Sequence, residues 1–186
     1  MESKYFTFLL AFAITISVPL IGYRLFGIIP ALIFLCGYLP GFVLWMISDN
    51  KTPFENIKVI FWIVLGLFLI HRVEENYTGF FEALSEFTNV PTPEISSLWV
   101  FLLVILSIGS WISAPFLIKR GNAFGYLFAW IFLCCCGISE LAHFVFPIFN
   151  GHGDGYGYFP GMLSVIALAP VSWYAMMILW YRKSYL

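Results

Sequence analysis

Charged residues are scarce in this chain, since Asp, Glu, Lys and Arg together make up 10% of its 186 residues and the formal net charge is −1. No basic tract of the kind that electrostatic binding to nucleic acid requires occurs, so nucleic acid is not an expected partner. Walker loops, dinucleotide-binding fingerprints and nucleophile elbows are also missing. These absences argue against the common nucleotide-dependent and serine-hydrolase classes.

Cysteine is rare as well. Cys36 and the run 134–136 all fall within apolar stretches, and their spacing matches neither a CxxC or Cys/His metal module nor a disulfide framework. A thiol in such a stretch behaves as a small apolar side chain, so we expect these residues to pack rather than to react.

Hydrophobic residues dominate instead, at 61% of the chain and a mean hydropathy of +0.92. A chain of this composition cannot bury its apolar side chains in one water-soluble core. Stretches long enough to cross a hydrocarbon layer about 30 Å thick lie at 5–23, 28–47, 57–75, 97–118, 123–148 and 160–181. The first shows no clean cleavage site, which favours a retained helix over a signal peptide. The sequence predicts an all-α integral membrane bundle of about six transmembrane helices, one domain over 1–186, with membrane lipid around it.

Lys and Arg residues in the short connections predict the orientation, because they accumulate on the cytoplasmic side. With the N-terminus inside, Arg24 and Arg72 lie outside, and all the others lie inside: Lys4, Lys51, Lys58, Lys119, Arg120, Arg182 and Lys183. We therefore expect cytoplasmic N- and C-termini, with the connections 76–96 and 149–159 facing outward.

The two outward connections differ in pattern. In 76–96, apolar residues recur at helical spacing at Phe80, Phe81, Leu84 and Phe87, which predicts a short helix on the outer membrane surface. The second connection has glycine at every second position from 151 to 157, which is typical of a flexible turn. The alternative is that it folds back, so that His152 and Asp154 serve as auxiliary ligands or proton carriers.

Two clusters of ionisable residues stand out because such residues are costly inside membrane spans and mark a functional site by default. His71, Glu74 and Glu75 lie at the outer end of the third stretch, at spacings that put them on one helical face. Glu140 and His143, also three residues apart, lie in the outer half of the fifth. Because both clusters reach a similar depth, we expect their tips to converge if these two spans are neighbours.

Convergence would bring two imidazoles and three carboxylates into a low-dielectric pocket, where unpaired charges are disfavoured. In the first interpretation His71, Glu74, Glu75, Glu140 and His143 hold a divalent metal, for which the mixed N and O donors suit zinc, iron or manganese. In the second, a glutamate and a histidine exchange protons with a lipid-soluble substrate without a metal. In the third, the clusters pair with Arg72 or with each other and only tie helices together.

The residues also resemble a known family. His71-x-x-Glu74-Glu75, followed by Tyr77 and Gly79-Phe80, then His143 with Pro147, and then Tyr158-x-Pro160-Gly161, is similar to the HXXEE-domain membrane proteins. The resemblance covers roughly residues 60 to 175. It implies a multi-span bundle with a shared polar site, at which His71, Glu74, Glu75 and His143 are the expected catalytic positions, but it supplies no reaction.

The leading hypothesis for function is a membrane enzyme that acts on a lipid-like substrate by metal-assisted or acid–base chemistry. A chain of Glu and His residues can also relay protons, which would make this an ion or proton pathway. A partner-binding or assembly protein that uses the His/Glu clusters as contacts between helices is the third hypothesis.

Overall fold

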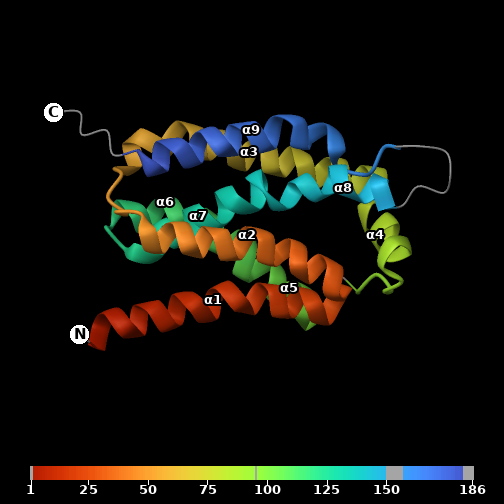
Figure 1. The fold of residues 1–186 in the computed structure, drawn as a ribbon, viewed down its shortest axis with the longest axis horizontal. Helices are drawn as coiled ribbons and strands as arrows, with labels where there is room; N and C mark the ends of the chain where they lie inside the picture. Colours follow the sequence, from red (N-terminus) through yellow and green to blue (C-terminus); the bar gives the residue numbers. More distant parts are fainter. Residues whose placement is uncertain (1, 95, 150–156, 182–186) are drawn as a thin grey trace.

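A computed structural model describes residues 2–94, 96–149 and 157–181. Six long helical spans make up most of these described residues (Figure 1). Their bounds are Tyr5–Phe26, Ile28–Ile47, Phe54–Thr78, Leu98–Lys119, Ala123–Phe149 and Met162–Trp180, each long and apolar enough to cross a membrane. No strand occurs among the described residues. The predicted all-α bundle of six membrane-spanning helices is confirmed.

The fifth span lies at the centre of the bundle. In its most apolar window 61% of the residues are buried, against 28–39% in the other five spans. Its first part, α7 (Ala123–Gly137), packs against α2 (Ile28–Ile47) on one side and against α6 (Ser110–Lys119) and α9 (Met162–Trp180) on the others. The core around it is aromatic, with Trp130 and Phe132 fully buried. The cysteines at 134–136 are buried and free in this helix, as expected for packing residues.

The remaining spans surround α7. Helix α1 (Glu2–Phe26) packs along α2, and α3 (Phe54–Thr78) packs along α9 on the opposite side of the bundle (Figure 1). The start of α1 and the end of α9 lie at the same end of the bundle, together with the α2–α3 and α6–α7 connections. The C-terminal end of α3 and the N-terminal end of α9 meet at the other end, and the polar clusters lie there.

Two spans are interrupted where the sequence predicts continuous helices. The fourth consists of α5 (Leu98–Val104), a five-residue π-helix (Ile105–Gly109) and α6. The fifth breaks after α7 into a 3₁₀ turn (Ser139–Leu141), followed by α8 (Ala142–Phe149). At this break the Gly137 carbonyl accepts a hydrogen bond from the Trp173 indole at 2.6 Å, and the Ser139 hydroxyl donates to the Ile33 carbonyl at 2.8 Å.

A short amphipathic helix, α4 (Phe80–Thr88), follows α3 after Gly79, whose φ of 77° is the left-handed conformation that glycine favours. Leu84 is buried, and Phe80 and Phe87 pack with Phe146 and Phe159 beneath the helix. The predicted helix is therefore present, and it covers the polar end of the bundle (Figure 1). The glycine-rich run 150–156, with His152 and Asp154, lies outside the described residues.

Candidate metal centre

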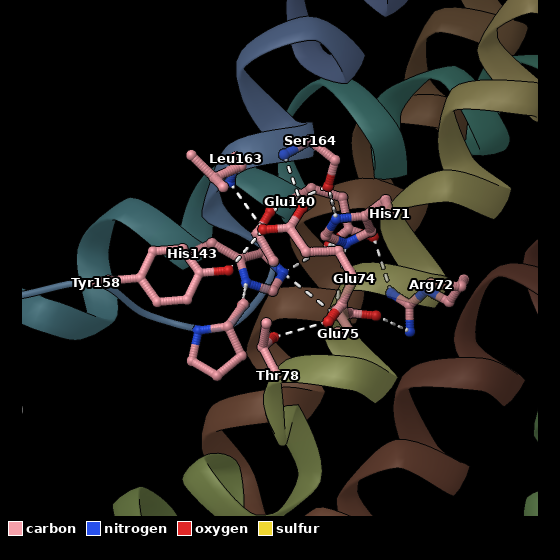
Figure 2. Close-up of polar contacts among 12 residues, drawn as sticks. His71, Arg72, Glu74, Glu75, Thr78, Glu140, His143, Tyr158, Leu163 and Ser164 are labelled. Atoms are coloured by element: carbon pink, nitrogen blue, oxygen red, sulfur yellow. Dashed lines mark hydrogen bonds and ion pairs between the residues drawn. The ribbon is translucent and has the colours of Figure 1, made fainter.

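Four of the five predicted site residues converge at this end of the bundle (Figure 2). His71 and Glu75 come from α3, Glu140 comes from the 3₁₀ turn, and His143 comes from the first turn of α8. Each offers one nitrogen or oxygen atom to a group in which all four atoms lie within 4.8 Å of one another. We call these four residues the His/Glu quartet. The break in the fifth span places Glu140 and His143 against α3, because the chain there follows a 3₁₀ turn instead of continuing along α7.

Each imidazole of the quartet faces both carboxylates through its Nε2 atom. His71 Nε2 lies 3.4 Å from Glu75 Oε1 and 3.2 Å from Glu140 Oε2. His143 Nε2 lies 3.3 Å and 3.2 Å from the same two oxygens. Two nitrogens and two oxygens therefore alternate around one point, with the two rings nearly perpendicular and 4.9 Å apart.

The opposite ring nitrogens are held by the start of the last span. His143 Nδ1 donates to the Pro160 carbonyl, which can only accept, so the proton of a neutral His143 is on Nδ1. His71 Nδ1 lies 2.9 Å from the Ser164 hydroxyl, which itself donates to the Gly161 carbonyl at 3.2 Å and therefore accepts from His71. In both neutral rings the lone pair on Nε2 then points at carboxylate oxygens. Such an arrangement is repulsive unless a cation, either a metal ion or a proton, lies between them.

Arg72 binds the outer oxygens of the same carboxylates. Its Nη1 lies 2.8 Å from Glu75 Oε2 and its Nη2 lies 3.3 Å from Glu140 Oε1. Each carboxylate thus gives one oxygen to the guanidinium and turns the other toward the imidazoles. Arg72 fixes the direction of the two inner oxygens, as an outer partner of a metal ligand does.

Glu75 Oε1 is buried and makes no hydrogen bond within the part of the chain that the structure describes. Zinc binds nitrogen and oxygen ligands at about 2.0–2.2 Å, which separates neighbouring ligand atoms in a four-coordinate site by roughly 3.3 Å. The four N–O distances of the quartet, 3.2–3.4 Å, are close to that separation, and all six distances among the four ligand atoms are within 4.8 Å. The donor set therefore fits one divalent ion, of which the orphaned oxygen would be one ligand.

Gly161 allows the last span to approach both imidazoles. Its φ is 93°, and a Cβ atom there would lie 2.6 Å from His143 Cε1 and 2.9 Å from His71 Cε1. Glycine is needed at this position for its backbone conformation and for its missing side chain. The Tyr158-x-Pro160-Gly161 segment that carries part of the family resemblance is thus in contact with the histidines.

Glu74, the fifth predicted site residue, does not join the quartet. Its carboxylate turns toward the first turn of α9, where it accepts hydrogen bonds from the backbone nitrogens of Leu163 at 3.0 Å and Ser164 at 2.8 Å. The Tyr158 hydroxyl donates to it at 2.6 Å. Desolvation and this bond to a carboxylate raise the pKa of Tyr158 above its usual value. Glu74 acts as an N-terminal cap for a helix far away in the sequence.

Two groups at the site could not be predicted from ionisable residues in spans, because the Pro160 carbonyl and the Ser164 hydroxyl carry no charge. Arg72 was predicted as a partner of the clusters only in the helix-tying interpretation, whereas it orients both quartet carboxylates. The sequence signal for these two neutral groups is the Pro160-Gly161 pair that opens the last span.

Comparison of the chain with protein-family models, with curated proteins and with solved structures found no match.

Proposed function

We propose that this integral membrane protein is a metalloprotein whose His/Glu quartet holds one divalent ion, and that it acts on a lipid-soluble substrate. The observation that carries the proposal is the fixed direction of both imidazoles. Pro160 and Ser164 occupy the Nδ1 atoms, so both Nε2 lone pairs face the inner oxygens of Glu75 and Glu140. A metal-ligating histidine typically donates its other ring N–H to a carbonyl or a similar group in this way.

The chain's own residues supply the orientation and the charge balance of the site. Arg72 orients both carboxylates, and α4 covers His143 through Phe80, whose ring lies 5.2 Å from the imidazole. His71 and His143 are 0% and 3% exposed, so bulk water does not reach them freely. Zinc, iron or manganese bound here would act as a Lewis acid on an oxygen of the substrate. The spans that carry the site are long and apolar, which favours a substrate that partitions into lipid.

The experiment that tests the metal is elemental analysis of detergent-purified protein by mass spectrometry. Wild-type protein is expected to carry about one zinc, iron or manganese per chain, and Glu75→Gln is expected to lose it. Glu74→Gln is the matched control, because it makes the same change one residue away on a carboxylate that faces α9. Absence of metal from folded wild-type protein purified without chelators, and after reconstitution with each of these metals, overturns the proposal.

A metal-free acid–base site is the second candidate, and Arg72 is the observation that favours it. The guanidinium already balances one of the two carboxylates, so a single proton on either imidazole makes the cluster neutral. In that case His71 and His143 share the proton between two carboxylates and exchange it with the substrate. Metal content separates the two candidates.

We also infer membership in the HXXEE-domain proteins from the motifs that carry the resemblance. Residues that the motifs place far apart in the sequence are in contact: Tyr158 with Glu74, Pro160 with His143, and Gly161 with both imidazoles. This contact supports the view that the motifs describe one site. The cytoplasmic side is proposed to be the end that carries the N- and C-terminal ends of the bundle, from the distribution of Lys and Arg.

A further inference from the structure

Two donor groups next to Phe68, three residues before His71 on α3, are buried without an acceptor in the described part of the chain. They are Arg72 Nε and the indole Nε1 of Trp111. Both side chains lie against Phe68: the guanidinium carbon is 5.1 Å from the centroid of that ring, and the Trp111 ring centroid is also 5.1 Å from it. Trp111 is 6% exposed, so its indole N–H is removed from water. A buried donor without a partner is unfavourable, so an acceptor that reached either donor would be favoured.

The two parts of the fourth span pack against different helices. Trp111 of α6 contacts α3 through Phe68, whereas α5, the other part of the same span, packs against α1 (Figure 1). The π-helix Ile105–Gly109 lies where the two parts join, and such segments often occur at functional sites. Arg72, one turn beyond Phe68, keeps 39% of its side chain exposed. Leu69, on the same side of α3 at a spacing of three residues, is 55% exposed, so the surface next to Arg72 is apolar.

The charge of the site favours an anionic acceptor. This argument rests on the proposed metal. With a divalent ion in the quartet and neutral imidazoles, the ion and Arg72 together exceed the two carboxylates by one positive charge. Glu74, the remaining carboxylate nearby, is bound to the first turn of α9, so one further anionic group is favoured next to the ion and the guanidinium. Arg is well suited to carboxylates and phosphates, and Trp111 supplies a second, neutral donor.

We propose that Arg72 and Trp111 form the head-group subsite for a lipid with an anionic oxygen head, a carboxylate or a phosphate. The head group enters from the membrane between α3 and the fourth span, accepts hydrogen bonds from Arg72 Nε and Trp111 Nε1, and lies beside the quartet. Its apolar chain extends over the Leu69 side of α3. On this proposal the substrates of the proposed function are lipids with an anionic head group.

The test measures lipid binding to detergent-purified protein whose metal content has been determined. The probes are oleate, methyl oleate and oleoyl-lysophosphatidic acid, which share one acyl chain and differ in the head. Oleate, the phosphate lipid or both are expected to bind about tenfold or more tightly than methyl oleate, because bonds to charged acceptors are the stronger ones. The tighter of the two identifies the head group.

The matched variants are Trp111→Phe and Trp62→Phe. The first keeps an aromatic ring between Phe68 and Phe132 but removes the indole N–H, and the second changes a tryptophan of α3 that is 40% exposed. Trp111→Phe is expected to weaken binding of the anionic lipid about tenfold with unchanged metal content, and Trp62→Phe to have no effect.

Two results overturn the subsite: equal affinity for methyl oleate and both anionic lipids, or a Trp111→Phe variant that binds the anionic lipid as wild type does. If metal-free wild-type protein still prefers the anionic lipid and Trp111→Phe weakens that binding, the subsite stands and only the proposed metal is overturned.

Discussion

Glu74 and Glu75 are neighbours in the sequence, yet their carboxylates bind different parts of the molecule. Glu74 accepts two backbone N–H groups at the start of α9, whereas Glu75 binds Arg72 and faces the two imidazoles. One residue along a helix turns a side chain by about 100°. The two glutamates of the motif therefore have separate roles, one in joining α3 to α9 and the other in the quartet.

Glu74→Gln is expected to lower the melting temperature while leaving the metal in place. The variant keeps one amide oxygen for three donors that the carboxylate now accepts, and charge-assisted bonds are the stronger ones. The expected loss in unfolding free energy is about 1–3 kcal/mol. Thermal unfolding in detergent measures it. Unchanged melting together with loss of metal would show that Glu74, and not Glu75, belongs to the ion.

Gly161→Ala is expected to abolish metal binding, because a Cβ atom would overlap both imidazoles. Gly121→Ala is the matched control. That glycine also has a positive φ, 66°, but a Cβ atom there meets nothing within 4 Å. The control variant therefore carries the strain of alanine at a positive φ, about 1 kcal/mol, but its Cβ atom meets no neighbour. Equal metal content in the two variants would mean that the approach of Gly161 to the histidines does not shape the site.

Ser164→Ala is expected to weaken metal affinity by about 10–100-fold, since it removes the acceptor that holds the Nδ1 proton of His71. Ser172→Ala is the control on the same helix, where the hydroxyl only donates to the Leu168 carbonyl at 2.7 Å. Competition with a chelating dye measures both affinities. Equal metal affinities of the two variants would show that Ser164 does not fix the tautomer of His71.

The stability that Tyr158 contributes is expected to disappear at high pH. Desolvation and the Glu74 carboxylate raise the pKa of Tyr158 in the folded protein, so the neutral phenol favours folding. That stability is complete below the pKa of an unfolded tyrosine, about 10, and is lost as the pH rises through the higher folded value. The melting temperatures of wild type and Tyr158→Phe should differ at pH 8 and converge at higher pH. A constant difference across that range would contradict the bond.

The sequence was sufficient to predict the six spans, because an apolar run long enough to cross a bilayer forms a transmembrane helix in nearly all cases. The sequence also predicted that His71 meets Glu140 and His143 if the third and fifth spans are neighbours, and these residues are in contact in the structure. Which glutamate of the pair faces Glu140 did not follow. Glu74 and Glu75 both neighbour His71 on α3, and only the packing of α9 against that helix separates them.

The sequence did not predict the neutral partners of the histidines, for a related reason. Pro160 and Ser164 act through a carbonyl and a hydroxyl, which occur all along any chain and gain meaning only from the position of α9. The π-helix and the 3₁₀ break were likewise missed. An apolar pattern does not distinguish a continuous span from an interrupted one. At the break after α7 the Gly137 carbonyl accepts from the indole of Trp173, a residue of another span.

The central claim is that the His/Glu quartet holds a metal ion, and the most direct test is the metal content of purified wild-type protein beside His71→Ala. We expect about one zinc, iron or manganese per folded wild-type chain, and its loss from a variant that still inserts and folds. Folded wild-type protein that carries no metal and takes up none of these ions on reconstitution would contradict the claim and leave the quartet as a proton site.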